Sequence, residues 1–253
     1  MKNASSNLLI LTATITPPVG AIKLSRTDPK LRLDDYIQAF KFYLPFVIEG
    51  KISGLIFADN SASDISEIQK ICQAYNINEK IEFISFEGLD YPPEYGRGYG
   101  EFKLIDYVMQ HSKLIAQASP DAYIWKITGR YILKNLGEIV FTRPAKADIY
   151  CHCRNIPIPW LDLFVLSWKK KVYNKTLKNI CEKIREDQIN TSSEIAFRSI
   201  LDNLDTQFSI TKRFRKVPDL QGIRGSDSQG YQEMKLKLLV RKVLNILVPW
   251  LWI

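Results

Sequence analysis

The sequence predicts an α/β protein with a mainly parallel central sheet flanked by helices. Short apolar runs rich in β-branched residues alternate along the chain with longer segments whose apolar residues recur at helical spacing. The first run, residues 8–15 (LLILTATI), is apolar almost throughout, which is typical of a central strand covered on both faces. With 253 residues, 46% of them hydrophobic and 25% charged, the chain can bury such a core, and a disordered chain is excluded.

Five strands are expected, and the segments between them indicate helices. Pro17 and Pro18 end the first strand, and the helix that follows carries Tyr36, Phe40 and Tyr43 at helical spacing. The expected strands are residues 8–15, 52–58, 81–86, 122–131 and 147–153. The expected helices are residues 34–50, 64–75 and 101–117, with a loop at Gly96, Gly98 and Gly100 before the third helix.

Beyond Cys153 the alternation of strands and helices becomes less regular. Pro157, Pro159 and Trp160 indicate a loop. Further helices are expected at residues 169–187, 192–204 and 231–248, with a loop at residues 211–230. We therefore expect a domain over residues 1–210 that holds the binding and catalytic site. A basic linker and an amphipathic helix should occupy residues 211–253.

The cysteines predict neither disulfides nor a zinc site. Cys72, Cys151, Cys153 and Cys181 follow no disulfide-framework spacing, which favours a reducing compartment. On a strand, Cys151 and Cys153 point to one face and His152 to the other, so the three side chains cannot converge on one metal ion. No stretch reaches the ~20 apolar residues that span a bilayer.

Four consecutive strands end in residues suited to a nucleotide diphosphate. Ligands of open α/β sheets bind at the carboxyl ends of the strands, where hydroxyl, glycine and cationic residues can surround phosphate groups. We therefore predict a nucleotide-binding site at this edge of the sheet. The candidate residues are Thr14, Arg32, Asp59, Asn60, Arg97, Gly98, Glu101, Lys126, Thr128, Gly129 and Arg130.

The segment LIFADNSASDISEI resembles the second-strand signature of family 2 glycosyltransferases, in which a hydrophobic strand leads into Asp-Asn/Asp-x-Ser-x-Asp and a helix. The resemblance implies the GT-A fold, a Rossmann-like α/β fold, and a contact between Asp59 and the nucleotide base. RTDPKLRLDDY, GRGYGEFKLIDY and WKITGRY are similar to segments of small glycosyltransferase-like proteins of bacterial surface polysaccharide clusters, which make O-antigen or capsule. The resemblance covers about residues 8–200.

The chain departs from that family where the Asp-x-Asp that holds a divalent ion should follow the fourth strand. The segment there reads AYIWKITGRY, so Lys126 and Arg130 are predicted to bind the pyrophosphate directly, assisted by Arg97, and no metal site is predicted. The resemblance implies a nucleotide sugar as ligand, and a UDP-sugar is favoured. Two alternatives stay open: Lys126 forms a structural salt bridge, and residues 59–64 form only a turn and a helix cap.

An inverting transferase needs a base that takes the proton of the acceptor hydroxyl. Glu194 in SSEIAFR resembles the acidic residue that follows the acceptor-binding loop of inverting GT-A enzymes, which implies this role for it. The alternative for Glu194 is a first-turn residue that complements the helix dipole. Asp162, in the expected loop WLDLF, is the second candidate base.

The end of the chain is basic and amphipathic. Residues 212–253 contain nine Lys or Arg and three Asp or Glu, so they carry +6 of the net charge of +8. Leu236, Leu239, Val240, Val243, Ile246 and Leu247 share one face of the expected helix. This pattern favours binding in the plane of an anionic membrane; packing on the protein itself or on a dimer partner is the alternative. The predicted membrane-binding residues are Lys235, Lys237, Arg241, Lys242, Trp250 and Trp252.

These observations predict a glycosyltransferase that moves a sugar from a nucleotide-diphosphate donor to a lipid-linked or growing polysaccharide acceptor. We expect it in the cytoplasm, peripheral on the inner face of the cell membrane. The alternative is a non-catalytic membrane-associated protein that binds a nucleotide or a partner. A nucleotidyltransferase is disfavoured because no glycine-rich loop follows the first strand. No nucleic-acid motif is present, so nucleic acid is not an expected partner, and the oligomeric state stays open.

Overall fold

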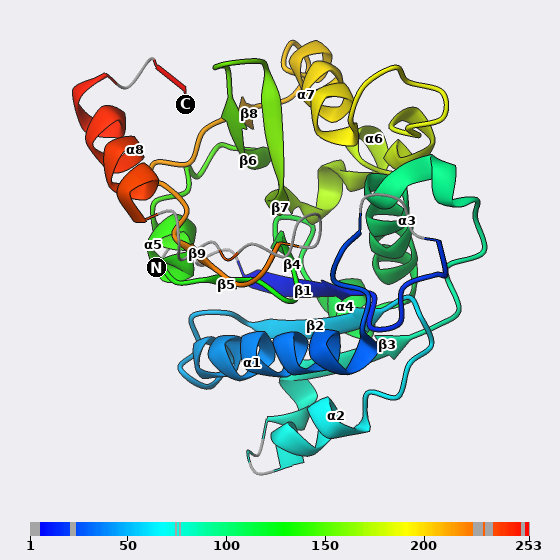
Figure 1. The fold of residues 1–253 in the computed structure, drawn as a ribbon. Coiled ribbons are helices and arrows are strands. Elements are labelled where there is room, and N and C mark those ends of the chain that lie inside the picture. Colours follow the sequence, from blue (N-terminus) through cyan, green and yellow to red (C-terminus); the bar gives the residue numbers. More distant parts are fainter. Residues whose placement is uncertain are drawn as a thin grey trace.

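The structure, a computed structural model, describes residues 6–20, 24–73, 75, 77–224, 230, 235–248 and 251–252, with the backbone alone for residues 235–237. The strands of its main sheet are β1 (Asn7–Ala13), β2 (Gly54–Asp59), β3 (Ile81–Ser85), β4 (Tyr123–Thr128), β6 (Ile149–Arg154), β7 (Trp160–Lys169) and β8 (Ile210–Thr211). Their order across the sheet is β3-β2-β1-β4-β7-β6-β8 (Figure 1). A small second sheet pairs β5 (Ile132–Leu133) with β9 (Leu220–Gln221).

The helices are α1 (Pro29–Ile48), α2 (Ser66–Gln73), α3 (Gly96–His111), α4 (Lys113–Gln117), α5 (Leu136–Phe141), α6 (Tyr173–Thr176), α7 (Ser193–Leu204) and α8 (Lys235–Leu247). Short 3₁₀ turns occur at η1 (Asn78–Lys80), η2 (Pro93–Tyr95), η3 (Lys170–Val172) and η4 (Ile180–Lys183). The expected single helix over residues 101–117 is divided between α3 and α4. The break is at Ser112, whose hydroxyl accepts a hydrogen bond from the backbone N–H of Ile115 and so caps α4.

The main sheet is mixed and mainly parallel, as predicted. β1 pairs in parallel with both β2 and β4, and β2 pairs in parallel with β3. β7 runs antiparallel between β4 and β6. All five expected strands are present within a few residues of their expected bounds. Because the first four strands are parallel, their carboxyl ends meet at one edge of the sheet.

Residues 157–187 differ most from the expectations. The expected loop at WLDLF is β7, whose residues are mostly buried between β4 and β6. The nearly continuous apolar run from Leu161 to Trp168 is a strand signal, but the two prolines before it favour a loop. The expected helix at residues 169–187 is replaced by η3, α6 and η4. Asn179, with φ of +57°, interrupts the helical path there.

The expected glycine loop before α3 is part of that helix, which begins at Gly96. A Cβ atom on Gly98 would lie 2.4 Å from Ser193 Oγ, and one on Gly100 would lie 1.8 Å from Tyr91 Oη. Glycine is required at both positions because α3 packs closely against α7 on one side and against Tyr91 on the other. This close packing brings the first turn of α7 next to the start of α3.

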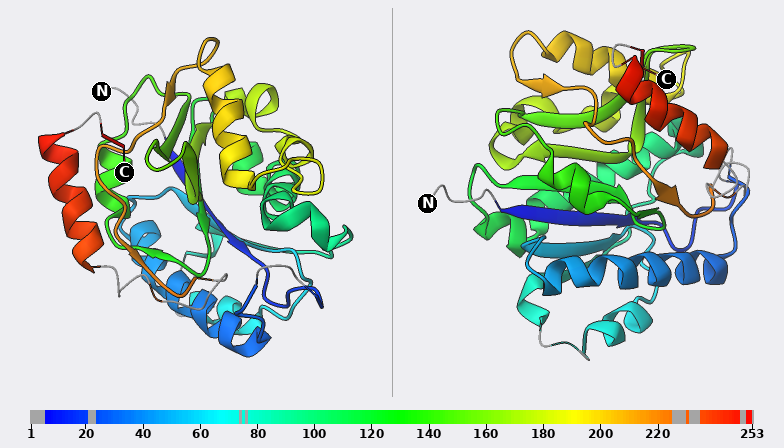
Figure 2. Two further views of the ribbon diagram at one scale, coloured as in Figure 1. Left: turned by 45° about the horizontal axis from the view of Figure 1, so that its top comes forward. Right: turned by 90° about the vertical axis from the view of Figure 1, so that its left-hand side faces the viewer.

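Helices cover both faces of the sheet (Figures 1 and 2). α1, α2 and α5 pack on one face, where Trp125 of β4 is fully buried. α3, α6 and α7 pack on the other face, where Trp168 of β7 is fully buried. Burying one such large side chain contributes roughly 2–3 kcal/mol to the stability of a fold. Alternation along β4 sends Trp125 to the first core and its neighbour Lys126 towards α3.

The C-terminal region packs along the α/β body. Residues 211–224, expected as a linker, contain the end of β8, the whole of β9 and the buried Phe214. The division of the chain at residue 210 stays a prediction. α8 lies on the side of the molecule away from α3 (Figure 1). None of the helices in the described ranges has the length and apolar character that crossing a bilayer requires.

Candidate active site

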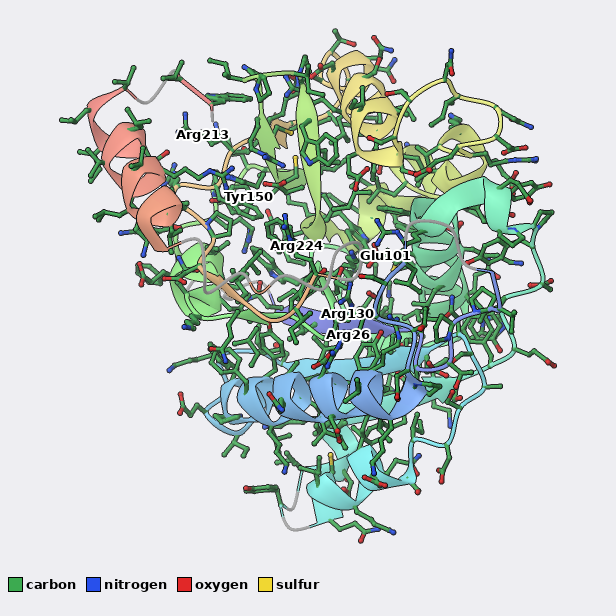
Figure 3. The ribbon with its side chains drawn as sticks, in the orientation of Figure 1. Arg26, Glu101, Arg130, Tyr150, Arg213 and Arg224 are labelled. Carbon is green, nitrogen blue, oxygen red and sulfur yellow. The ribbon has the colours of Figure 1, made fainter. Side chains whose placement is uncertain are left out.

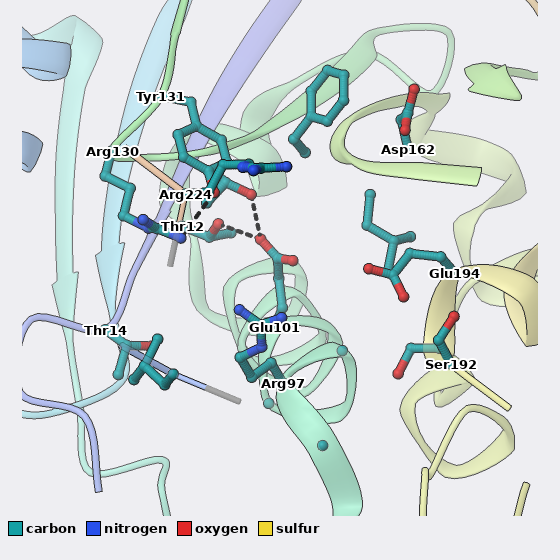
Figure 4. Close-up of a pocket in the computed structure, with 18 of the residues that line it drawn as sticks. Thr12, Thr14, Arg97, Glu101, Arg130, Tyr131, Asp162, Ser192, Glu194 and Arg224 are labelled. Carbon is teal, nitrogen blue, oxygen red and sulfur yellow. Dashed lines mark hydrogen bonds between the residues drawn. The ribbon is translucent and has the colours of Figure 1, made fainter. Parts of the chain in front are cut away.

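A cavity of about 650 Å³ lies at the carboxyl ends of β1 and β4. Its walls are the loop after β1, the start of α3, the β6–β7 hairpin and part of α7 (Figure 4). Leu238 and Arg241 of α8 line it as well. Among the predicted site residues, those that line it are Thr14, Arg32, Arg97, Gly98, Glu101, Thr128, Arg130, Asp162 and Glu194. Asp59, Asn60, Lys126 and Gly129 lie outside its lining. The predicted edge of the sheet therefore carries a cavity, but four predicted residues do not reach it.

Two residues of α1 hold the loop that follows β1. Arg32 Nε donates to the Thr14 carbonyl oxygen at 2.8 Å, and Arg32 Nη1 donates to the Arg26 carbonyl oxygen at 3.0 Å. The Thr14 N–H donates to Tyr36 Oη at 3.0 Å. Arg32 is only 5% exposed, so its main effect is to fix the loop while its positive charge remains beside the cavity.

Asp59 is buried and organises the loop after β2, in contrast to the base contact that the resemblance implies. Its carboxylate accepts hydrogen bonds from the backbone N–H groups of Ile15 (2.9 Å), Ser61 (3.1 Å) and Ser63 (3.1 Å). Its neighbour Asn60 is 2% exposed. These contacts match the turn interpretation of the acidic loop. Asp59 can therefore act on the cavity only through the backbone that it holds. Asn60 acts through Thr14, whose Oγ1 donates to Asn60 Oδ1 at 2.6 Å and which lines the cavity.

Lys126 forms a buried salt bridge instead of facing the cavity. Its side chain is 0% exposed, and Nζ lies 2.5 Å from Glu101 Oε1. Nζ also donates to the Leu163 carbonyl oxygen and to Thr128 Oγ1. Burial lowers the pKa of Lys126, and the charge of Glu101 opposes that shift. The prediction of a direct pyrophosphate contact is therefore wrong for Lys126, because the cost of burying its ammonium is offset by a carboxylate of the protein.

Arg130 does reach the cavity. Its guanidinium donates to the Ile223 carbonyl oxygen at 2.5 Å and to Tyr131 Oη at 2.9 Å. It forms no salt bridge with the described part of the chain. Gly129, just before it, packs against β1, and a Cβ atom there would lie 2.8 Å from the Thr12 carbonyl oxygen. Gly129 therefore serves the packing of the strand end, whereas Arg130 lines the cavity.

Arg97 is an exposed cation at the start of α3. It lines the cavity and makes no hydrogen bond or salt bridge with the other described residues. The N-terminus of α3 lacks a side-chain cap, so its first-turn N–H groups add a partial positive charge. Figure 3 shows how Glu101, Arg130 and Arg224 come together from distant parts of the chain. The part of the cavity near Arg97 and Arg130 is therefore suited to an anion.

Glu194 faces this region from the first turn of α7 (Figure 4). Burial raises the pKa of its carboxyl above the ordinary value of 4.5, and the nearby charge of Arg97 opposes this effect. A higher pKa makes the ionised group a stronger base. Asp162 lines the same cavity from β7, where it pairs with Arg154 at 2.6 Å. The guanidinium makes Asp162 the less suitable base of the two.

The end of β4, where an Asp-x-Asp would hold a metal ion, does not fit a divalent cation. Thr128, Arg130 and Tyr131 are the residues there that line the cavity, and Oε1 of Glu101 is already paired with Lys126. A divalent cation needs several oxygen ligands and is repelled by a fixed guanidinium. Across the described residues, no three His, Cys, Asp or Glu side chains gather as metal ligands.

The β6–β7 hairpin brings residues to the cavity that the sequence interpretation missed. His152, Arg154 and Trp160 all line it. Burial lowers the pKa of His152 to about 4, so this imidazole is neutral near pH 7. Cys151 and Cys153 point into the core on the other side of the strand, as predicted. In the sequence, the alternation of side chains along the strand indicated only that His152 faces away from Cys151 and Cys153. The β6–β7 hairpin shows that the His152 side chain faces a cavity.

Comparison of the sequence with protein-family models and with curated proteins gives no significant match. Among solved structures, the inositol-1-phosphate CTP transferase from T. maritima has a TM-score of 0.50 at 12% identity, with 95% of this chain and 97% of that chain covered. The galactosyltransferase LgtC, in complex with donor and acceptor sugar analogues, has a TM-score of 0.49 at 9% identity, with 81% and 72% covered. A protein named for nucleotide-diphospho-sugar transfer, from Desulfovibrio desulfuricans G20, has a TM-score of 0.47 at 10% identity, with 83% and 80% covered. The chain thus has an α/β fold similar to that of the inositol-1-phosphate CTP transferase, and the likeness concerns the fold alone.

Proposed function

We propose that this protein is a glycosyltransferase that moves a sugar from a nucleotide-diphosphate donor to an acceptor hydroxyl. One observation carries the proposal: Arg97 and Arg130, which form no salt bridge with the described chain, share a cavity with the half-buried carboxyl of Glu194 (Figure 4). Sugar transfer requires both stabilisation of an anionic leaving group and a base near the acceptor hydroxyl.

In the proposed reaction, the diphosphate of the donor binds between Arg97 and Arg130. Thr14, Thr128 and the loop held by Arg32 form the wall beside it. As the bond to the sugar breaks, negative charge grows on the departing diphosphate oxygen. The two permanently charged guanidinium groups stabilise this charge more strongly in the transition state than in the bound donor, which lowers the barrier.

Glu194 acts as the base in this proposal. It takes the proton of the acceptor hydroxyl while that oxygen attacks the anomeric carbon. The bond from this carbon to the diphosphate oxygen breaks, and the nucleoside diphosphate leaves with its electron pair. Trp160 and Asp162 line the cavity as well, and they offer an aromatic face and a carboxylate to an acceptor sugar.

Replacing Arg97 or Arg130 by Ala is expected to weaken the binding of UDP about 10-fold to 100-fold, because each variant loses a charge-assisted contact to phosphate. Isothermal titration calorimetry measures the change. Arg215→Ala is a matched control, since Arg215 is exposed and lies outside the cavity lining. Unchanged UDP affinity in both cavity variants would contradict the proposed diphosphate site.

Two other functions would give different results in assays of the intact chain. A nucleotidyltransferase releases pyrophosphate when it is given a nucleoside triphosphate and a sugar 1-phosphate. The loop after β1 argues against this reaction, because it presents Pro17 and Pro18 to the cavity in place of a glycine-rich turn. A non-catalytic nucleotide-binding protein would bind UDP-sugars without turnover under any acceptor condition.

We further propose that the acceptor is a lipid-linked or growing polysaccharide, and that α8 holds the protein on an anionic membrane at the inner face of the cell membrane. The support is an exposed apolar strip on α8, formed by Leu239, Val240, Val243, Ile246 and Leu247. An apolar helical face of this kind binds at the level of the lipid headgroups.

Several of the polar and aromatic residues predicted to bind lipid contact the protein. Arg241 lines the cavity, and Lys242 pairs with Asp219 at 3.1 Å. The Trp252 carbonyl oxygen accepts a hydrogen bond from the Asn155 N–H, so this tryptophan is held at the β6–β7 hairpin. Trp250 and the side chains of Lys235 and Lys237 lie outside the described residues. The apolar strip, rather than these residues, therefore carries the membrane proposal.

Ile246→Asp is expected to reduce the fraction of protein that floats with anionic phospholipid vesicles by at least about threefold, because it places a charge on the apolar strip. Ile246 is 77% exposed, so the substitution disturbs little packing. Tyr75→Asp is the control, since Tyr75 is also exposed but follows α2. Equal flotation of the wild type and Ile246→Asp would overturn the proposed membrane contact.

A further inference from the structure

Glu101 lines the cavity, and only one of its two carboxylate oxygens accepts hydrogen bonds from other described side chains. Oε1 lies 2.5 Å from Lys126 Nζ and accepts hydrogen bonds from Thr12 Oγ1 and Thr128 Oγ1, both at 2.9 Å. Oε2 accepts no hydrogen bond from the described residues. The side chain remains 20% exposed and lines the cavity. One oxygen is therefore saturated, while the other is open to a ligand.

Lys126 fixes the orientation of this carboxylate. Its ammonium is completely buried and is held at the same time by the Leu163 carbonyl oxygen and by Thr128 Oγ1. Because three donors converge on Oε1, turning the carboxylate away would leave a buried ammonium without its counter-charge, which is costly. Oε2 is consequently held in one position rather than being free to rotate.

We propose that Glu101 Oε2 accepts a hydrogen bond from a ring hydroxyl of the sugar-nucleotide donor, and that Lys126 is the positioning residue that holds Glu101 in this role. The inference rests on the proposed function. The hydroxyl belongs either to the ribose or to the transferred sugar, and both present the same chemistry to a carboxylate. A fixed acceptor discriminates strongly against a ligand that lacks the matching hydroxyl, because its oxygen then stays desolvated and unpaired.

The position of Glu101 in the cavity agrees with this assignment. In Figure 4, Glu101 lies between Arg130 on one side and Glu194 on the other. The rings of a donor bound with its diphosphate at the arginines would reach this part of the cavity. A carboxylate oxygen repels phosphate but accepts from a hydroxyl, and the paired ammonium of Lys126 limits that repulsion.

The test measures discrimination between ligands rather than affinity alone. UDP, 2′-deoxy-UDP, 3′-deoxy-UDP and UDP-glucose are titrated into the wild type, into Glu101→Gln, and into the double variant Glu101→Gln/Lys126→Met. The double variant removes both charges, so it avoids leaving Lys126 unpaired if the single variant folds poorly. Glu79→Gln is the control, since Glu79 is exposed and lies outside the cavity lining.

For a ribose contact, we expect the wild type to bind UDP at least about tenfold more tightly than one of the deoxy analogues, and this ratio to approach one in the variants. For a contact to the transferred sugar, the deoxy analogues bind like UDP, and only the extra affinity for UDP-glucose is lost. If the variants keep the affinity ratios of the wild type for all four ligands, the inference about Glu101 is overturned, but the proposed function is not. A wild type that binds none of the four ligands overturns the proposed function as well.

Discussion

The rate of sugar transfer is expected to fall by about 10²-fold to 10⁴-fold when Glu194 is replaced by Gln, because the amide cannot take the proton of the acceptor hydroxyl. Steady-state kcat with a UDP-sugar and an acceptor measures the loss. UDP affinity should stay within about twofold of the wild type, since Glu194 is proposed to contact the acceptor rather than the diphosphate. Glu79→Gln, at an exposed position, serves as the control.

The pH dependence of transfer tests the same role of Glu194. Burial raises the pKa of its carboxyl above 4.5, and a general base works only when it is ionised. Activity should therefore be lost on acidification with a midpoint above pH 4.5. The charge of Arg97 lowers this pKa, so Arg97→Ala should move the midpoint to still higher pH.

A Glu194→Gln enzyme with wild-type kcat would contradict the assignment of the base. Asp162→Asn then becomes the decisive variant. Asp162 pairs with Arg154, so its replacement also leaves a guanidinium unpaired. A loss of kcat that appears only in Asp162→Asn, with wild-type thermal stability, would transfer the role to Asp162.

The largest expected effect on stability comes from Lys126→Met. The substitution leaves the carboxylate of Glu101 on the cavity floor without its counter-ion, and breaking a buried ion pair on one side costs about 3 kcal/mol or more. Urea unfolding, followed by circular dichroism, measures the free energy of unfolding. Glu101→Gln in the same chain should restore most of the loss, because it removes the charge that the first substitution left unpaired.

Lys51→Met is the matched control for this experiment. Lys51 pairs with Glu49 at 2.6 Å, but its side chain is 61% exposed, so its loss should cost less than about 1 kcal/mol. A Lys126→Met protein as stable as the wild type would show that the ammonium is not the counter-charge on which Glu101 depends. If Glu101→Gln does not restore the free energy of unfolding of Lys126→Met, the loss comes from packing rather than from charge.

The order of strands and helices could be predicted because each element carries its own pattern. The continuous apolar run of β1 and the spacing of Tyr36, Phe40 and Tyr43 in α1 report local burial, and the structure confirms both elements. β7 escaped prediction because the two nearby prolines are as strong a local signal as its apolar run. Gly98 and Gly100 were interpreted as a loop because sequence alone does not reveal that Ser193 and Tyr91 pack against them.

The sequence predicted the edge of the sheet at which the cavity lies, but not the contacts of every residue there. The carboxyl ends of parallel strands must meet at one edge of a sheet, so the position of the cavity followed from the fold class. Arg97, Arg130 and Glu194 line it, whereas Asp59 is engaged by three backbone N–H groups of nearby loops. Asp59 shows why the residue type alone was insufficient: a carboxylate that stabilises a turn and one that binds a ligand look alike in sequence.

Local patterns were enough to establish an α/β chain with a polar strand edge, because the spacing of apolar residues depends only on the geometry of a single helix or strand. The partner of Lys126 was settled by packing between elements. α3 crosses the sheet so that Glu101 Oε1 lies 2.5 Å from Lys126 Nζ of β4. Lys126, which was predicted to bind phosphate, therefore pairs with a carboxylate of the protein. Charge pairing depends on which helix covers which strand, and no pattern within either segment encodes that choice.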